Sequence, residues 1–258
     1  MFNEEKIISK WAADMYDQNE TYTNDAEFAL SLIGKEPKKI LEIACGSGRL
    51  LIPIAKAGHS VTGLDFDKYM LDKITAKAAD MKNITWRKSD VLSDDWGNGF
   101  DVVMLAANFL FNIVSDLEYE KAQAMLIQKS ADALAAGGHI YIDYGYSLHP
   151  ESWFNNPNEN IIWDGVDSDG NSGKMSLLNS TFDVESGMNY FTRRFELTLS
   201  DGGTITQDIP SKKHFATVAQ IHAWLKCAGF ELEEEFGDYD RNPIGEKTDR
   251  AIIWARKK

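Results

Sequence analysis

Cysteine is scarce in this chain, and it contains no long apolar run. The 258 residues include two cysteines, Cys45 and Cys227, which lie far apart and lack metal-ligand spacing. This excludes a disulfide framework as the organising feature, and two thiols suit a reducing cytoplasm. No apolar run approaches the roughly 20 residues that span a bilayer, and the first residues lack the pattern of a signal peptide. We therefore expect a soluble, cytoplasmic protein with no membrane contact.

Basic residues are also in short supply. Lys and Arg number 27 against 40 Asp and Glu, which gives a formal net charge of −13. Because a nucleic-acid-binding surface needs a basic face, nucleic acid is disfavoured as a partner. An acidic surface instead favours neutral or cationic small molecules. The length and the apolar fraction of 43% predict one large domain, or one domain with a sizeable insertion.

Short apolar runs alternate with helical periodicity between residues 39 and 144. Five runs have the length and content of buried strands: residues 39–44, 60–65, 83–87, 101–105 and 139–143. Strands that alternate with helices form a parallel sheet covered on both faces. Pro53 indicates that the first helix begins later than Ser47. Ser115 and Glu118 have capping-box spacing and predict the start of a long helix that ends at Gly137.

The period changes after residue 160. Four strand-like segments follow up to residue 215, separated by turn-forming clusters, and predict an antiparallel meander. The first cluster, Asp167–Asn171, resembles a calcium loop, but Gly165 stands where such a loop needs an oxygen ligand. We interpret it as a hairpin turn and expect no metal site. A helix capped by Thr217 and strands at 230–236 and 250–255 follow.

Together these patterns predict an α/β, Rossmann-like fold. Its core is a doubly wound, mostly parallel seven-stranded sheet, with an antiparallel β insertion after the fifth strand.

The strongest chemical signal is the segment from Glu42 to Arg49, between the first strand and the first helix. Its small residues, Ala44, Gly46 and Gly48, let the backbone approach a ligand closely. A dinucleotide fingerprint needs a third glycine where this chain has Leu51. In addition, the acid in front of the loop would repel a pyrophosphate but attract an ammonium or sulfonium group. The alternative is an ordinary strand-to-helix turn.

Acids also follow the next two strands. Asp65 ends the second strand, where a carboxylate can accept hydrogen bonds from ribose hydroxyls, although it could instead cap the following helix. Asp90, in Ser89–Val91 after the third strand, can bind an exocyclic adenine amine or serve as a surface turn acid.

These segments, in this order, resemble the class I S-adenosylmethionine-dependent methyltransferases. Glu42–Gly48 resembles their first motif, with Ala44 in place of its first glycine. Gly63–Asp67 resembles their ribose-binding motif and Ser89–Val91 their adenine-binding segment. Phe100–Phe109 and Leu134–His139 resemble the motifs of the fourth and fifth strands. The resemblance covers roughly residues 39–144.

The resemblance implies S-adenosylmethionine as cofactor. It also implies a site for it, and Tyr16, with Tyr22 as the alternative, would contact the carboxylate of the methionine part. Arg49 would either contact the same carboxylate or lie solvated on its helix. The implied cofactor residues are Tyr16, Glu42, Ala44, Gly46, Gly48, Arg49, Asp65, Phe66, Met70, Asp90, Val91, Ala106, Asn108 and Phe111.

The acceptor is expected after the fourth and fifth strands, at Phe109, Asn112, Tyr144, Tyr146 and His149. The aromatic faces of Phe109 and Phe111 would attract the sulfonium methyl, or else the two rings are core residues. His149 is either a general base or a loop residue. No dedicated catalytic residue stands out.

The leading hypothesis is methyl transfer to a small-molecule acceptor, with an amine slightly preferred. The layout resembles small-molecule N-methyltransferases with a β insertion. The alternatives are a nicotinamide-dependent oxidoreductase and a non-catalytic S-adenosylmethionine binder. Residues 1–38 are expected to form a helical segment over the cofactor site, and residues 39–149 with 214–258 the catalytic domain. The insertion, residues 150–213, is expected to form a lid, a homodimer interface, or both.

Overall fold

The computed structural model describes residues 4–258, and these form two compact units. One unit comprises residues 22–148 and 216–258. The other comprises the N-terminal residues up to 21 together with residues 149–215. Residues 1–3, the start of the expected N-terminal segment, lie outside the described residues. We describe each unit by itself.

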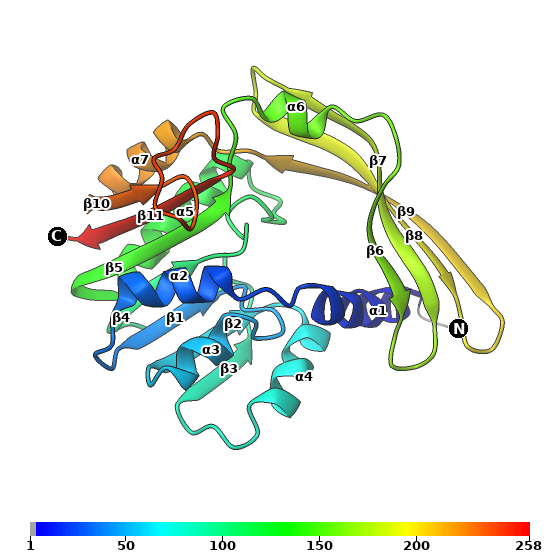
Figure 1. The fold of residues 1–258 in the computed structure, drawn as a ribbon, viewed down its shortest axis with the longest axis horizontal. Helices are drawn as coiled ribbons and strands as arrows, with labels where there is room; N and C mark the ends of the chain where they lie inside the picture. Colours follow the sequence, from blue (N-terminus) through cyan, green and yellow to red (C-terminus); the bar gives the residue numbers. More distant parts are fainter. Residues whose placement is uncertain (1–3) are drawn as a thin grey trace. The chain divides into compact units, whose positions relative to one another are not determined.

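The first unit is built on a seven-stranded sheet (Figure 1). Its strands are β1 (Lys39–Ile43), β2 (Ser60–Asp65), β3 (Ile84–Lys88), β4 (Phe100–Leu105), β5 (Leu134–Gly145), β10 (Phe230–Phe236) and β11 (Arg250–Lys257). The order is β10-β11-β5-β4-β1-β2-β3, and β11 pairs antiparallel with both of its neighbours. The predicted α/β fold with a mostly parallel seven-stranded sheet is confirmed.

Helices lie on both sides of this sheet. They are α2 (Asn24–Ile33), α3 (Leu51–Lys56), α4 (Lys68–Lys77), α5 (Tyr119–Ala133) and α7 (Val218–Cys227). A core cluster joins apolar residues of α2, α3 and α4 to the strands, and α5 packs against α7. Figure 1 shows α2 in front of the sheet and α5 and α7 behind it. Burial on both faces explains why β1 and β4 are nearly continuous apolar runs.

The strand register brings the ends of the central strands into line. Glu42 in β1 lies beside Gly63 in β2 and Met104 in β4. A Cβ on Gly63 would come within 2.6 Å of the Sγ atom of Cys45, so this position accepts only glycine without movement of its neighbours. The carboxyl ends of β1, β2, β4 and β5 therefore meet at one edge of the sheet, where ligands bind in open α/β folds.

Several predicted element boundaries need correction. Helix α3 starts at Leu51, so Pro53 lies in its first turn, where backbone N–H groups have no helical acceptor. The capping box at Ser115 was wrong: the Ser115 hydroxyl accepts from the backbone of Leu117, and α5 begins at Tyr119 without a side-chain cap. Helix α5 ends at Ala133 and β5 begins directly after it, before the glycine pair.

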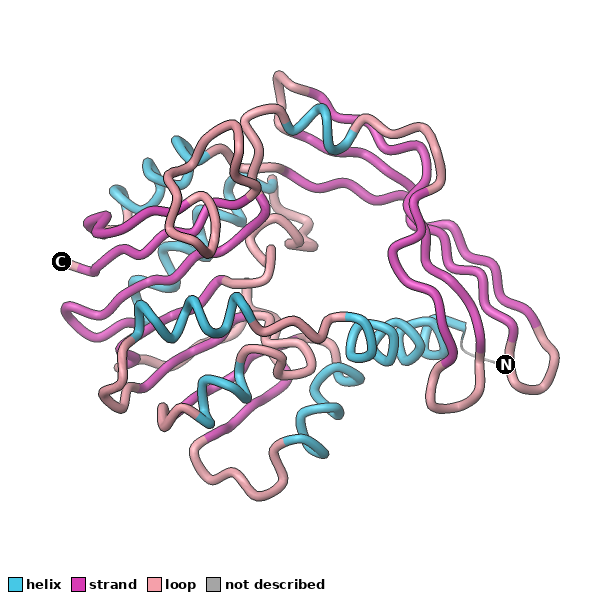
Figure 2. Tube along the Cα trace, in the orientation of Figure 1, coloured by secondary structure: helices cyan, strands magenta, loops and turns pink. Residues whose placement is uncertain are grey.

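The second unit is an antiparallel meander with one long helix and one short one (Figure 2). Its elements are α1 (Glu4–Asn19), α6 (Pro150–Phe154), β6 (Asn160–Val166), β7 (Ser172–Asp183), β8 (Met188–Thr198) and β9 (Thr204–His214). The four predicted strands are confirmed, in the order β6-β7-β8-β9. Asp167 closes the β6–β7 hairpin by accepting the backbone N–H groups of Asp169 and Asn171.

Helix α1 shares a core with this meander. Ile8, Trp11 and Met15 pack against apolar residues of β7, β8 and β9. Helix α2, by contrast, belongs to the first unit, so the N-terminal segment expected as one piece is divided between the two units. No helix among residues 4–258 has the length and apolarity needed to cross a membrane.

Candidate functional site

The loop after β1 has an unusual backbone. Ala44, Gly46 and Gly48 have φ values of +56°, +53° and +82°, in the left-handed region that favours glycine. A Cβ on Gly48 would come within 3.1 Å of the side chains of Ile52 and Ile74. The loop thus depends on small residues, and Ala44 holds a conformation that costs an L-residue about 1–2 kcal/mol.

Asp65 ties this loop to the end of β2. One of its carboxylate oxygens accepts the backbone N–H of Gly46, and the other accepts that of Asp67, both at 2.8 Å. The cap of α4 is Asp67, whose carboxylate accepts from Tyr69 and Met70. Burial raises the pKa of Asp65, and the two backbone hydrogen bonds oppose that shift. Asp65 therefore connects the two loops, and the alternative of a helix cap is excluded.

Glu42 presents an unsatisfied acceptor at the same edge. Its side chain is buried, and its Oε2 atom has no hydrogen-bond partner among the described residues. Burial raises the pKa of Glu42 well above its usual range, and the charge of Arg49 opposes that shift. A buried acceptor without a partner costs about 1–3 kcal/mol, so this oxygen is suited to a ligand that donates a hydrogen bond.

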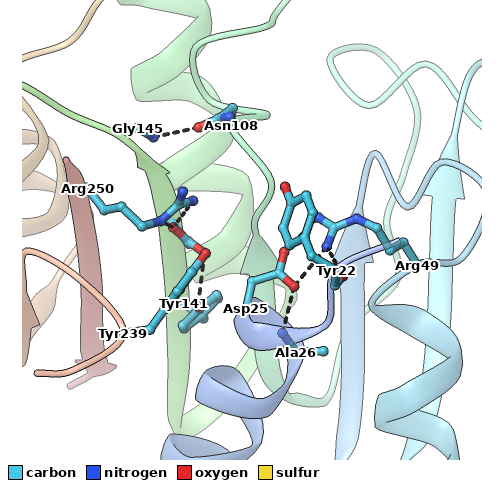
Figure 3. A network of polar contacts seen from close by, with 10 residues as sticks. Tyr22, Asp25, Ala26, Arg49, Asn108, Tyr141, Gly145, Tyr239 and Arg250 are labelled. Atoms are coloured by element: carbon cyan, nitrogen blue, oxygen red, sulfur yellow. Dashed lines mark hydrogen bonds and ion pairs between the residues drawn. The ribbon is translucent and has the colours of Figure 1, made fainter. Parts of the chain in front are cut away.

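Arg49 is held by the start of α2 (Figure 3). Its guanidinium forms an ion pair with Asp25 at 2.6 Å, and both side chains are almost fully buried. It also donates to the backbone oxygen of Tyr22 and lies 4.3 Å from the centre of that ring. Arg49 is therefore not a solvated helix residue. Asp25 was missed in the sequence, since 24 residues separate the partners.

The backbone is also left-handed after β4. Ala107 and Asn108 have φ values of +52° and +62°, and asparagine tolerates this region better than most residues. The Asn108 backbone N–H donates to the oxygen of Asp143, and its side-chain oxygen accepts the N–H of Gly145 (Figure 3). Asn108 thus joins the ends of β4 and β5.

Near Asn108, Ala106 is buried, Phe109 and Phe111 are half-buried, and Asn112 is exposed.

A buried acid in β5 was not among the sequence candidates. Asp143 is fully buried and pairs with Arg250 at 2.5 Å, and the hydroxyls of Tyr239 and Tyr141 donate to it (Figure 3). Burial raises the pKa of Asp143, while Arg250 and Tyr239 oppose that shift. An acid inside the apolar run Ile140–Tyr144 was the available signal, because a buried carboxylate requires such partners.

Two tyrosines lie at the carboxyl end of β5, Tyr144 within the strand and Tyr146 directly after it. Tyr144 donates to the backbone oxygen of Ala216, and its ring meets that of Tyr146 edge-on at 5.9 Å. Burial raises the pKa of both hydroxyls, so both stay protonated at neutral pH.

Some candidate residues near this edge of the sheet are exposed or only half-buried. Asp90 is exposed and accepts from Leu92 and Ser93, which lower its pKa, as expected of a surface turn acid. Phe66 is 66% exposed, and Met70 and Val91 are half-buried.

Two further candidates belong to the second unit. Tyr16 lies on α1, where its ring meets Trp163 edge-on at 6.1 Å. His149 is exposed, with its Nδ1 atom 3.5 Å from Glu151.

Comparison with known proteins agrees with a candidate functional site at this edge of the sheet. A family model described as a methyltransferase domain matches residues 40–138. Residues 40–138 therefore carry a methyltransferase domain, which supports an S-adenosylmethionine-dependent enzyme. The match covers the loop after β1 and the ends of β2 and β4. It sets aside the nicotinamide-dependent alternative.

Relatives and solved structures extend the likeness beyond that domain. A Geobacillus protein named as a candidate methyltransferase is 25% identical over 224 residues, which cover 85% of each chain. An S-adenosylmethionine-dependent methyltransferase from Clostridium acetobutylicum has a similar fold, with a TM-score of 0.72, 14% identity and 99% coverage of both chains. The sugar N-methyltransferase KedS8 from Streptoalloteichus has a TM-score of 0.71 and 16% identity, covering 94% of this chain and 91% of its own.

Proposed function

We propose that this methyltransferase acts on a small-molecule acceptor, and that the acceptor atom is an amine nitrogen. The observation that carries the proposed cofactor site is the unpartnered Oε2 atom of Glu42 beside the loop of Ala44, Gly46 and Gly48. A buried carboxylate with a free acceptor fits a cationic donor such as the ammonium group of S-adenosylmethionine. When bound, that cofactor supplies a methyl group already activated by its sulfonium.

The remaining binding roles follow from the strand ends. Asp65 keeps lone pairs for ribose hydroxyls after accepting its two backbone hydrogen bonds. In this proposal Phe66, Met70 and Val91 flank the adenine, while Ala106, Asn108 and Phe111 line the site after β4. Asp90 lies at the same strand end, but two local hydrogen bonds already occupy its carboxylate.

The protein's main task is alignment. Asn108 joins the ends of β4 and β5 through its two hydrogen bonds. In this proposal the acceptor lies beside Phe109, Asn112, Tyr144 and Tyr146. Proximity and orientation alone supply a large part of the barrier reduction in such a transfer.

An amine is favoured because it needs only loss of its own ammonium proton. A hydroxyl acceptor needs a strong base, and Tyr144 and Tyr146 remain protonated. Similarity to a protein named as a sugar N-methyltransferase supports the same reading.

Calorimetry with S-adenosylhomocysteine tests the cofactor site, and absence of any binding would overturn it. Transfer of a labelled methyl group to matched pools of primary amines and of alcohols then tests the acceptor. Label in the amine pool is expected, and label confined to the alcohols would contradict the proposal.

A further inference from the structure

One face of the second sheet carries two cations on an apolar surface. Strands β8 and β9 pair without a bulge, so Arg193 lies opposite Ile209, and Lys213 lies opposite Asn189. Alternate residues of a strand share a face, which places Arg193 on the same face as Phe191 and Phe195. Lys213 lies on this face too, with its Nζ atom 5.5 Å from the centre of the Phe191 ring.

The immediate surroundings of Arg193 are apolar. Its cross-strand neighbours are Leu177 in β7 and Ile209 in β9, and both border the core that α1 forms with this sheet. Within the described residues, no side chain forms an ion pair or hydrogen bond with the Arg193 guanidinium. Its burial lowers its pKa, but an arginine stays charged at any physiological pH.

The next residue of β8 is also an arginine, and this one has an acidic partner. Arg194 points to the opposite face and forms a bidentate pair with Asp208, at 2.7 and 2.6 Å. Asp208 therefore pairs with Arg194, whereas no acid among the described residues pairs with Arg193. A charge removed from water without a partner costs free energy, which an arriving anion would recover.

Lys213 is also desolvated. Burial lowers its pKa to about 8, and the charge of Arg193 acts in the same direction. The nearby Trp11 provides a further donor: its indole N–H is buried without a partner among the described residues, and its ring meets Phe195 edge-on at 6.4 Å. Three hydrogen-bond donors, on Arg193, Lys213 and Trp11, are thus associated with this face. No carboxylate in the part of the chain that the structure describes pairs with Arg193.

An aromatic wall borders the same face. Phe182 in β7 lies opposite Asn189, which in turn lies opposite Lys213, so the three form one row across the strands. The Phe182 ring stacks on Phe154 at 5.6 Å and meets Phe215 edge-on at 6.3 Å. A ligand with an oxyanion next to a flat apolar group matches this combination.

We propose that this face of the β insertion binds a small molecule that carries an oxyanion, a carboxylate or phosphate, next to a flat apolar group. Arg193 recognises the oxyanion through its planar fork, Lys213 adds a second charge, and the aromatic row holds the adjoining apolar part.

Phenyl phosphate is the probe, tested by calorimetry on the full chain. The wild type is expected to bind it, and Arg193→Gln to weaken binding by about tenfold, the loss typical of a charged hydrogen bond. Arg194→Gln is the matched control on the same strand and should stay within about twofold, because that side chain faces away. No binding by the wild type, equal binding by Arg193→Gln, or an equal loss in Arg194→Gln would each overturn the proposal.

Thermal unfolding separates an anion site from a structural role. Without phosphate, Arg193→Gln should melt no lower than the wild type, because it removes an unpaired charge from an apolar face. Phenyl phosphate should raise the melting temperature of the wild type and leave that of the variant unchanged. If Arg193→Gln unfolds, Lys213→Gln provides the same comparison, and retained binding in it would contradict the proposal.

S-adenosylhomocysteine binding keeps this test distinct from that of the cofactor site. All three variants should bind it as the wild type does, since the residues lie on the second unit.

Discussion

The carboxylate of Glu42 lies where few neighbouring groups stabilise its ionised form. Burial raises the pKa of Glu42 well above its usual range, because the ionised form is removed from water. In the unfolded chain the same group ionises near its usual pKa. The contribution of Glu42 to folding stability is therefore fully present below about pH 4.5 and is lost as the pH rises through the raised pKa.

Replacement of Glu42 by glutamine should remove this pH dependence. Chemical denaturation across the pH range is expected to show that the wild type loses stability relative to Glu42→Gln as the pH rises from about 4.5. Glu118→Gln, at an exposed position, should keep the wild-type slope over the same window. A constant difference in stability between the wild type and Glu42→Gln over this window would contradict the assignment.

The pH dependence of cofactor binding should also reflect the ionisation of Glu42. The ammonium group of S-adenosylhomocysteine favours ionised Glu42, so this ligand should bind more tightly as the pH rises, with release of a proton. Calorimetry in buffers of different ionisation enthalpy measures that proton directly. Glu42→Gln should weaken binding at neutral pH by about tenfold, the loss expected for a charge-assisted hydrogen bond, and should release no proton.

Ala44 offers a stability test at one backbone position. Its φ of +56° costs an L-residue about 1–2 kcal/mol, and part of this returns as lost chain entropy when glycine is introduced. Ala44→Gly should therefore stabilise the protein by about 0.5–1 kcal/mol in urea denaturation. Ala57→Gly, at a φ of −72°, should do the opposite. Loss of stability in Ala44→Gly would show that the alanine methyl packs in a way that outweighs its strain.

At the scale of elements, the buried pair of Arg49 and Asp25 fixes α2 to the loop before α3. Removal of one partner leaves the other charge buried, which typically costs about 3–5 kcal/mol. Asp25→Asn and Arg49→Met should each lower the free energy of unfolding by that order. The double variant should lose less than the sum of the two, as a double-mutant cycle measures. Additive losses would mean that the pair does not couple the elements.

The elements that the sequence predicted well are those set by local pattern. Alternating apolar runs located the parallel strands, and the turn clusters located the meander, because burial and turn chemistry act within a few residues. The start of α5 was misplaced, since the Ser115–Glu118 spacing is short enough to occur outside a helix. Pro53 was the more dependable marker of a helix start.

The residues of the candidate site were likewise predictable only where a local sequence pattern marks them. Strand ends gave Glu42, Asp65 and Asn108, because such ends gather at one edge of a parallel sheet. Asp25 and Asp143 were not found, since their arginine partners lie 24 and 107 residues away and meet them only in the fold. The unpartnered oxygen of Glu42 is likewise a property of packing.

At the scale of the whole molecule, the chain divides into two units that are not contiguous in sequence. Deletion of residues 150–213 alone would remove the sheet that buries Ile8, Trp11 and Met15 of α1. That variant should aggregate, as light scattering would show, because the helix keeps an apolar face without a partner.

Removal of the helix as well should restore a well-behaved protein. A chain of residues 22–148 joined by a short linker to residues 216–258 is expected to bind S-adenosylhomocysteine, because Glu42, Asp65 and Asn108 all belong to the first unit. This expectation follows from the proposed cofactor site. Loss of cofactor binding in a folded truncation would contradict it.

The division of α1 from its sheet also sets an order of events during synthesis. The helix is made roughly 200 residues before the end of β9, the strand that completes its core. At about 5–20 residues per second, the apolar side of α1 waits on the order of 10–40 s for its partner. During that interval the nascent chain keeps an exposed apolar segment, so binding of a chaperone during synthesis is expected at α1.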